Sequence, residues 1–452
     1  MMLPQEPGGE EGPGRFRLLR ALKLGTFHIG SSAADLLISA IWNRVMIVEL
    51  GIVAWPVALL SALRYLLAPL SLWAGHRSDS RLLWGTRRVG YIWLGRALML
   101  LSLPLLPWST VQLAREPGSA GGWALAFLSF TLFGLGTLLS GPAYLALVHD
   151  SAPYERRGQA VGVVQFMLVA SFAFLPLFYA RMMPDYEPAA YWRMVLTGMA
   201  AAAVLWFLSV WREERTIAAP ARLTPARPLR DALRGLWVGE STRRYALFLA
   251  ASAFFAFMQD AVLEPFGGEV FGLSVGETTR FNAYWGSGVL VGMLATLAIT
   301  RRRDPHQQVD TTGWGLAWMG IPLLGLGVAS ALASLAWVRP LLLLFGLGFG
   351  VFTVGGVSLL MAMSRERQAG IYLALWSAIQ LVSRGAGIAA GGALRDLALA
   401  LTGGFASAYA AVFWVEAVGA LGCIALLRRV DVAGFAAGRQ AVDAVEALAG
   451  AD

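Results

Sequence analysis

The stretch QDAVLEPFG, residues 259–267, corresponds to an earlier stretch, NRVMIVELG, at residues 43–51. The two stretches align without a gap at an offset of 216 residues, and both end in glycine. Each closes a run of apolar residues and places charged side chains near the end of that run. A motif that recurs after nearly half of a 452-residue chain indicates an internal repeat of two similar halves.

The composition is that of an integral membrane protein. Hydrophobic residues make up 57% of the chain and charged residues only 14%, far from the balance of a soluble domain. Because a spanning helix needs roughly 20 mainly apolar residues, the sequence predicts twelve spans, at residues 27–50, 52–75, 89–110, 122–148, 160–180, 191–211, 245–266, 279–300, 313–336, 340–363, 370–392 and 406–427. A membrane β-barrel is excluded, since its strands would alternate apolar and polar side chains.

A long charged segment, residues 212–244, divides these spans into six and six. The sequence therefore predicts an all-α membrane protein with two pseudo-symmetric six-helix bundles, the architecture of the major facilitator superfamily. The predicted parts are a cytoplasmic N-terminal segment at 1–26, a first bundle at 27–211, a cytoplasmic linker at 212–244, a second bundle at 245–428 and a cytoplasmic tail at 429–452.

The Lys and Arg residues are distributed unequally between the two sides of the membrane. If the N-terminus is cytoplasmic, the inward segments hold 26 of the 36 Lys and Arg residues and the outward loops hold six. Such an imbalance predicts that both termini are cytoplasmic. The net charge of +8 is therefore not the footprint of a nucleic-acid-binding protein. Residues 1–26 are polar and rich in Pro and Gly, and they predict no signal peptide.

Charged residues inside the apolar spans are costly and predict an internal partner. Asp260 and Glu264 lie four residues apart on one face of a helix, where like charges repel, so they require a cation. Arg44 has no partner on its own predicted helix, because Glu49 is about 140° around the axis. Arg44 and Asp260 lie at similar depths, roughly 22 to 26 Å above the cytoplasmic end at 1.5 Å per residue. We therefore expect Arg44 to pair with Asp260, assisted by Glu264; the alternative is a set of interfacial charges solvated by headgroups.

Two further buried ion pairs are predicted. Asp35 and Arg64 lie near mid-depth on neighbouring antiparallel spans, and Arg384 and Glu416 are candidates for a corresponding pair in the second half. Periodicity alone does not say which helix faces meet.

The segment GHRSDSRLLWGTRR, residues 75–88, resembles the loop between the second and third helices of major facilitator proteins. The resemblance is imperfect, because extra residues separate the aspartate from the last two arginines. It implies a cytoplasmic latch between the halves formed by Gly75, Asp79, Arg81, Arg87 and Arg88. The alternative is that these charges only set the topology.

The sequence shows no zinc-protease, P-loop, paired CxxC, nucleophile-elbow or dinucleotide-binding motif in a usable context. It therefore predicts no catalytic residues, no protein-bound metal and no enzymatic activity.

The repeated stretches NRVMIVELG and QDAVLEPFGGEVFGLSVGETT, with GHRSD and RRVGYIW around them, resemble the bacteriochlorophyll-delivery family, the PucC/LhaA-type branch of the major facilitator superfamily. The resemblance covers residues from about 16 to 428. It implies a multi-pass protein of the inner, intracytoplasmic membrane of a phototrophic bacterium. Such proteins are thought to deliver bacteriochlorophyll to light-harvesting antenna polypeptides or to chaperone those polypeptides. The implied cargo is bacteriochlorophyll, and the implied partners are antenna polypeptides, pigment-synthesis enzymes and membrane lipids, with no nucleic acid.

A magnesium tetrapyrrole takes one axial ligand, often a neutral imidazole. Of the four histidines, His28 is the best candidate, because it stands at the start of the first span and an apolar face follows it. The alternative is an interfacial hydrogen-bonding histidine, with the ligand supplied by water, a carbonyl or the client protein.

Two other functions stay open. One is a secondary transporter driven by protons through Asp35, Asp260 or Glu264. The other is a structural subunit that remains bound to a photosynthetic complex through an exposed apolar flank.

Overall fold

The protein is represented by a computed structural model that describes residues 18–70, 82–86, 88–152, 156–213, 240–301, 303–363, 369–432 and 434. In the first half of the chain its helices are α1 (Leu18–Leu36), α2 (Trp42–Arg44), α3 (Ala54–Leu66), α5 (Val89–Ser102), α6 (Leu105–Arg115), α7 (Ala120–Asp150), α8 (Arg157–Met182) and α9 (Pro188–Val210). In the second half they are α11 (Glu240–Phe255), α12 (Leu263–Phe271), α13 (Val275–Thr300), α14 (Val309–Ala331), α15 (Leu335–Ala362), α16 (Ala369–Thr402) and α17 (Phe405–Arg428).

The protein is an all-helical, multi-pass membrane protein. Within the described residues, nine helical segments are long and apolar enough to cross a membrane, and a tenth is the bent pair formed by α11 and α12. The two other predicted spans, 52–75 and 370–392, overlap α3 and α16. Helix α3 is a shorter apolar helix that ends at Leu66, and residues 71–81 are not described.

The first and seventh spans both lose regular α-helical form where the repeated stretches lie. In the first, α1 is followed by two π-helical turns, Leu37–Ile41 and Val45–Glu49, on either side of α2. In the seventh, α11 ends at Phe255, a 3-10 turn covers Met258–Ala261, and α12 continues at an angle of 43°. Pro265 accounts for this break, because a proline ring clashes with the carbonyl four residues earlier, here that of Ala261.

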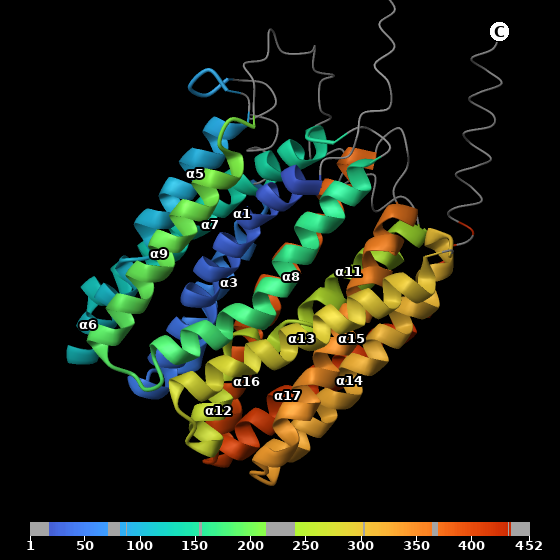
Figure 1. The fold of residues 1–452 in the computed structure, drawn as a ribbon. Coiled ribbons are helices and arrows are strands. Elements are labelled where there is room, and N and C mark those ends of the chain that lie inside the picture. The colour runs from blue at the N-terminus through green and yellow to red at the C-terminus, as the bar shows by residue number, and fades with distance from the viewer. Residues whose placement is uncertain are drawn as a thin grey trace, which may run out of the picture.

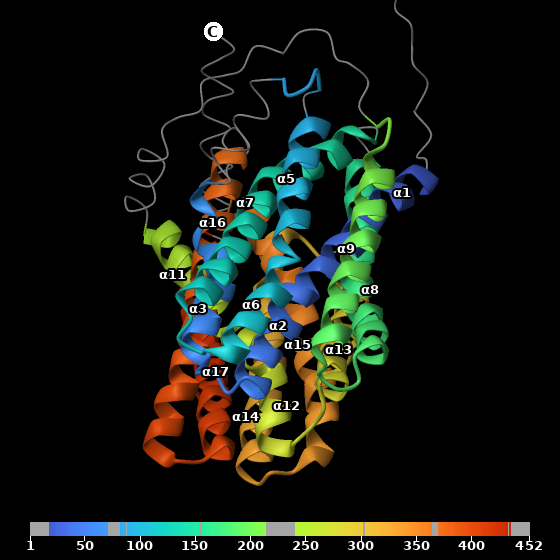
Figure 2. The same ribbon diagram turned by 90° about the vertical axis from the view of Figure 1, so that its left-hand side faces the viewer.

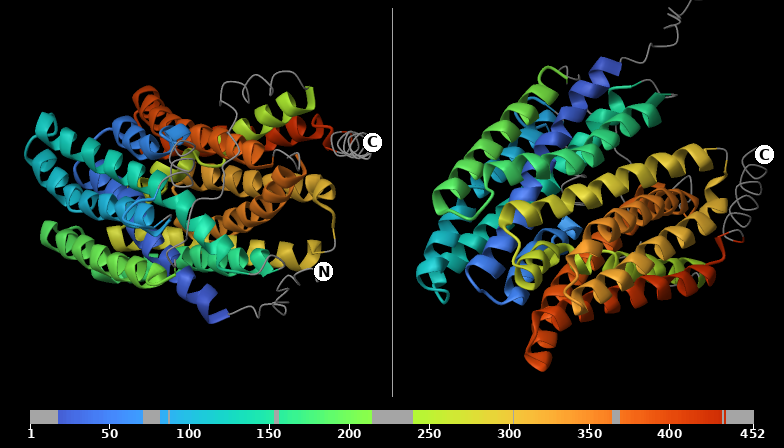
Figure 3. Two further views of the ribbon diagram at one scale, coloured as in Figure 1. Left: turned by 90° about the horizontal axis from the view of Figure 1, so that it is seen from above. Right: turned by 60° about the horizontal axis from the view of Figure 1, so that its bottom comes forward.

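The helices of the two halves form two groups that lie side by side. Figure 3 shows the blue-to-green helices of the first half on one side and the yellow-to-red helices of the second half on the other. The groups meet where α3 packs on α16 and where α8 packs on α13. The first contact joins spans two and eleven, and the second joins spans five and eight. A twofold repeat of six spans relates the first contact to the second. Figure 1 shows α8 beside α13, and Figure 2 shows α3 near α16.

Helix α1 begins at Leu18, nine residues before the predicted first span. Arg20 and Lys23, in this extension, form ion pairs with Glu213 at the end of α9, at 2.6 and 2.7 Å. These contacts explain why the helix continues beyond its apolar segment. The linker and tail predicted at 212–244 and 429–452 fall largely outside the described residues, and their boundaries stay a prediction.

Candidate functional site

Two ion pairs occupy the middle of the interface between the halves. Arg64 of α3 pairs with Asp35 of α1, so the structure brings these two residues together as the sequence analysis expected. Arg384 of α16 pairs with Asp260 at 2.8 Å. The side chains of Arg384 and Asp260 are about a quarter exposed, whereas that of Arg64 is buried.

The ring of Tyr65 connects these two ion pairs. The guanidinium carbon of Arg64 lies 4.6 Å from the ring centre and that of Arg384 lies 4.3 Å from it. Arg384 also lies 3.8 Å from the ring centre of Phe257. Because the negative face of an aromatic ring attracts cations, one tyrosine side chain holds an arginine from each half.

The predicted pair between Arg44 and Asp260 is not formed. Arg44 pairs with Glu49 at 2.9 Å and donates a second hydrogen bond of 2.9 Å to the carbonyl of Leu273. Its guanidinium packs directly against Gly268, where a Cβ atom would lie 2.7 Å from the guanidinium carbon. Arg44 therefore does reach the second half, but it contacts the C-terminal end of α12 instead of Asp260.

Two departures from regular helix explain this correction. The turn Val45–Glu49 is π-helical, so residues five apart come to the same side of the helix, and Glu49 is within reach of Arg44. The predicted depth of Asp260 assumed one continuous helix. Because the helix is broken before α12, this depth is wrong, and Asp260 lies beside Arg384. The carbonyls at the end of α12 also carry partial negative charge, which favours a cation there.

The predicted pair between Arg384 and Glu416 is also absent, since Asp260 takes the arginine. Glu416 is fully buried in α17 and faces the backbone of Gln259 and the side chain of Asp260. Neither of its carboxylate oxygens makes a hydrogen bond of normal geometry among the described residues. Glu264 is likewise buried; Asn282 donates to one of its oxygens, and the other oxygen has no partner there.

A third set of charges, which the sequence analysis did not single out, lies at the ends of α12 and α16. Arg395 is buried and pairs with both Glu269 and Asp396. The hydroxyl of Tyr409 donates to Glu269 at 2.5 Å. Asp396 in turn accepts hydrogen bonds from two backbone N–H groups at the start of α3, in the other half.

One signal in the sequence could have indicated this contact. Helix α3 begins after Val53, with no Ser, Thr, Asp or Asn at its first positions, so its free N–H groups lack a local acceptor. Such a helix start needs an acceptor from another segment or from water. Asp396 supplies this acceptor, but it lies beyond residue 392, where the eleventh span was predicted to end, because α16 continues to Thr402.

Among the described residues, three polar contacts join the halves at this end of the molecule, which we call the joined end. Asp396 binds the start of α3, and Arg44 binds the carbonyl of Leu273. The backbone N–H of Gly276 donates to the carbonyl of Pro184 at 2.8 Å. At Gly276 a Cβ atom would lie 2.8 Å from the carbonyl oxygen of Ala180, which shows how closely the backbones approach.

The predicted latch lies mostly outside the described residues, which do not include Gly75, Asp79, Arg81 or Arg87. Arg88 is described and pairs with Asp150, at the end of α7, at 2.9 Å. The role of these residues in linking the halves therefore stays a prediction.

His28 is half-buried in α1 and lies edge-on to aromatic rings. Its ring centre is 5.9 Å from that of Phe27 and 5.1 Å from that of Tyr144. Phe27 is stacked on Tyr144 and also lies 4.1 Å beneath the guanidinium carbon of Arg96. His28 therefore contacts the same ring of Phe27 that Arg96 contacts. Within the described residues, no three His, Cys, Asp or Glu side chains converge to hold a metal ion.

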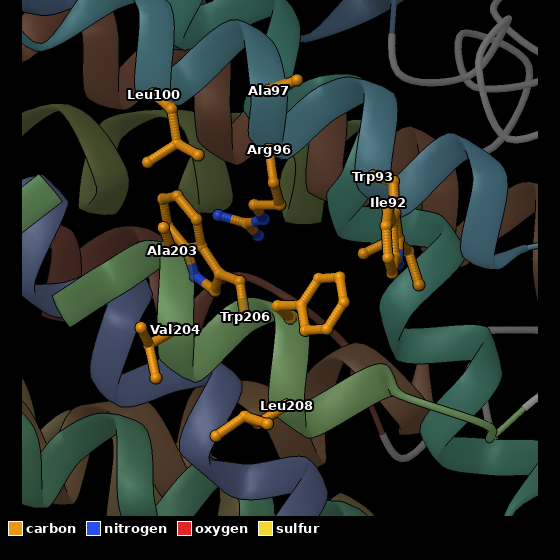
Figure 4. A pocket seen from close by; sticks show the side chains of 10 residues that line it. Ile92, Trp93, Arg96, Ala97, Leu100, Ala203, Val204, Trp206 and Leu208 are labelled. Carbon is orange, nitrogen blue, oxygen red and sulfur yellow. The ribbon is translucent and has the colours of Figure 1, made fainter. Parts of the chain in front are cut away.

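A cavity of about 470 Å³ lies between α5 and α9, away from the interface of the halves. Its lining is apolar and aromatic apart from one arginine, and consists of Ile92, Trp93, Arg96, Ala97, Leu100, Ala203, Val204, Trp206, Phe207 and Leu208. Figure 4 shows Arg96 extending from α5 towards Trp206 of α9.

The comparisons with known proteins agree on one family and one fold. The family model described as PUCC protein matches residues 41–435. Protein PucC of Rhodovulum sulfidophilum is 32% identical over 391 residues, which cover 84% of this chain and 85% of that protein. The bacteriochlorophyll synthase 44.5 kDa chain of Rhodobacter capsulatus is 29% identical over 411 residues, which cover 88% of this chain and 92% of that protein.

Among solved structures, this fold is similar to that of a bacterial homologue of the human lysosomal transporter Spinster, in an inward-facing and unoccupied conformation. The TM-score is 0.63 at 15% sequence identity, with 94% of this chain and 97% of that chain covered.

Proposed function

The chain belongs to the PUCC protein family and has a fold like that of major facilitator transporters, and from this premise we propose that it assists the assembly of light-harvesting complexes in a phototrophic bacterium. In this role it delivers bacteriochlorophyll to antenna polypeptides, or chaperones those polypeptides while pigment is inserted. Bacteriochlorophyll is then a cargo, and antenna polypeptides and pigment-synthesis enzymes are partners. The family and the fold are generally not those of enzymes.

One structural observation carries the proposal beyond family membership. The apolar, aromatic cavity lies between α5 and α9, which stand on the outer flank of the first group of helices (Figure 2) and not between the halves. Four of its lining residues are exposed: Ala97, Val204, Phe207 and Leu208. A molecule dissolved in the bilayer can therefore reach it sideways, as an apolar pigment requires.

The paired charges between the halves are consistent with a protein that holds its helices in one arrangement. Arg64, Arg384 and Arg395 are each paired with a carboxylate of the protein itself. An arrangement of helices that separated these pairs would leave buried charges without partners, which is costly. We propose that α3 and α16 complete twelve spans in two bundles, in the inner membrane and with both termini in the cytoplasm. On that orientation the joined end faces the periplasm.

Removing the protein from a phototrophic host tests this function. We expect membranes of the deletion strain to lose near-infrared antenna absorption while free pigment is still made, and the wild-type chain to restore it. Arg193→Gln, an exposed change on α9, serves as the matched variant that restores it as well. Normal antenna absorption in the deletion strain, together with a colourless protein purified in mild detergent, contradicts the proposal. Stoichiometric retention in the finished antenna complex would instead support a permanent structural subunit.

A second candidate function, proton-coupled transport, is favoured by the buried carboxylates of Glu264 and Glu416. Each has oxygen atoms without a hydrogen-bond partner in the described part of the chain. Buried carboxylates without a cation are suited to binding and releasing protons. Electrical recording on proteoliposomes distinguishes this function: a pH step moves charge in the wild-type chain and not in Glu416→Gln if the protein is proton-coupled.

A further inference from the structure

Among the buried arginines of the described residues, Arg96 differs from Arg44, Arg64 and Arg395 in having no acidic partner. Its guanidinium donates a hydrogen bond of 3.0 Å to the sulfur of Met99 and lies over the rings of Phe27 and Trp206, at 4.1 and 4.6 Å. The residue is only 7% exposed, and its Nε–H has no hydrogen-bond partner in the part of the chain that the structure describes. Among the described residues no carboxylate lies within ion-pair distance of it.

The contrast within this chain makes Arg96 informative. A carboxylate is paired with each of Arg44, Arg64, Arg384 and Arg395. A charge at membrane depth is costly unless it has a partner, and contact with aromatic rings offsets only part of this cost. A cation kept in an apolar cavity without a counter-ion therefore indicates that the counter-ion belongs to a ligand.

The cavity determines what else the ligand must be. Apart from Arg96, its lining offers aliphatic and aromatic surface, with Trp93 and Phe207 in ring contact at 4.6 Å across α5 and α9. The indole N–H of Trp93 is buried and has no partner in the described residues, so it is a second available donor. The ligand is therefore mostly apolar, with one anionic group and few other polar atoms.

The surroundings of Arg96 favour a terminal carboxylate over a phosphate that carries a headgroup. The guanidinium lies against Trp206, whose indole is held by hydrogen bonds of 3.0 and 3.1 Å to Phe27 and Ser31. Arg96 is seven residues into α5, roughly 10 Å along the helix from its start. A phosphate that carries a glycerol headgroup would have to bring that polar group into the apolar cavity, whereas a terminal carboxylate would not.

We propose that the cavity between α5 and α9 binds an apolar molecule that has a single carboxylate. This molecule arrives through the bilayer, and its carboxylate binds Arg96. Two sources share this chemistry: a long-chain fatty acid, and a tetrapyrrole that retains one free propionate. The tetrapyrrole source rests on the proposed function, whereas the fatty-acid source does not. A bidentate contact between guanidinium and carboxylate is the strong interaction on which recognition depends.

Binding to the purified full-length chain in phosphatidylcholine nanodiscs tests the proposal. The probes are pyropheophorbide a, a fluorescent tetrapyrrole with one carboxylate, and its methyl ester, which has the same ring system without the charge. We expect the acid to bind about tenfold or more tightly than the ester, because a charge-assisted hydrogen bond is lost in the ester. Displacement by palmitate, but not by methyl palmitate, identifies the fatty-acid source; acid binding that palmitate does not displace identifies the tetrapyrrole source.

Variants locate the binding site. Arg96→Gln should reduce acid binding to the level of the ester, Arg96→Lys should retain a preference for the acid, and Arg193→Gln on the same helix α9 as the cavity should change neither. Ala203→Phe keeps Arg96 but fills the cavity, so it should weaken the binding of both probes. If Arg96→Gln does not fold, Ala203→Phe still tests whether the probes bind in this cavity.

Three results overturn the proposal. The first is equal affinity of the wild-type chain for acid and ester, including no binding of either. The second is unchanged acid binding in Arg96→Gln. The third is loss of acid binding when phosphatidylglycerol replaces phosphatidylcholine, which assigns Arg96 to a lipid phosphate. Because these measurements use purified protein, they can fail while the deletion strain still loses its antenna, so failure of this site and failure of the proposed function are distinguishable.

Discussion

The side chain of Asp396 in α16 accepts a hydrogen bond of 2.7 Å from the backbone N–H of Trp55, at the start of α3. Its other carboxylate oxygen accepts one of 3.0 Å from the N–H of Ala54. One half of the chain thereby caps a helix of the other half. A capping side chain normally comes from the helix's own N-terminal segment, but here that segment supplies none.

Replacing this cap should destabilise the joined end. We expect Asp396→Ala to lower the free energy of unfolding by about 1–2 kcal/mol, since two N–H groups lose their acceptor. Thermal unfolding in detergent measures the change, and Asp396→Asn should lose less because its amide oxygen still accepts. Asp310→Ala, at an exposed position in the first turn of α14, is the control. Equal unfolding temperatures for Asp396→Ala and the wild-type chain would show that the contact contributes nothing.

Charge exchange should identify the partner of Asp260. The double variant Asp260→Arg with Arg384→Asp should recover part of the stability that each single variant loses, with a coupling energy of about 0.5–3 kcal/mol typical of residues in contact. The double variant Asp260→Arg with Arg44→Asp should recover none, because Arg44 contacts Glu49 and Leu273 instead. A double-mutant cycle on unfolding temperatures measures both. Recovery only in the Arg44 combination would contradict the observed pairing.

The ring of Tyr65 should matter more than its hydroxyl. Tyr65→Phe keeps an aromatic face for both guanidinium groups, whereas Tyr65→Leu removes it. Each cation–π contact is worth about 0.5–2 kcal/mol, so Tyr65→Leu should be clearly less stable than Tyr65→Phe in the same detergent. If the two variants unfold at the same temperature, the ring does not bind the arginines.

Close helix packing should make one glycine of α16 irreplaceable. A Cβ atom at Gly391 would lie 1.9 Å from the carbonyl oxygen of Met258, so Gly391→Ala forces α16 away from the break in the seventh span. Overpacking of this kind costs about 1–3 kcal/mol. Gly422→Ala in α17 is the matched control, because no atom lies within 4 Å of that position. The measurement is again the unfolding temperature, and a Gly391→Ala protein as stable as the control would show that α16 shifts at no cost.

Much of the architecture could be predicted because it depends on local properties. The length of each apolar run determines whether a helix can cross the bilayer, and ten of the predicted spans correspond to described helical segments that are long and apolar enough to do so. The repeated stretches 43–51 and 259–267 lie in the first and seventh spans, whose segments α2 and α12 are in contact. The ion pair of Asp35 with Arg64 could also be expected, since both residues lie on neighbouring antiparallel spans at similar depth.

The choice of partners among the remaining charges was decided only by the tertiary structure. Pairing depends on the direction in which a side chain leaves its helix, and that direction changes wherever the helix is irregular. The π-helical turn brought Glu49 to Arg44, and the break at Met258–Ala261 brought Asp260 to Arg384. The ten residues by which α16 exceeds its predicted span carried Asp396 to α3.

The amino-acid sequence alone therefore determined that this protein is a helical, multi-pass membrane protein, because hydrophobic length is a property of contiguous residues. Only the tertiary structure decided which charges neutralise one another and that Arg96 lacks a carboxylate partner among the described residues, because those relations depend on helix azimuth and on contacts between residues far apart in the chain.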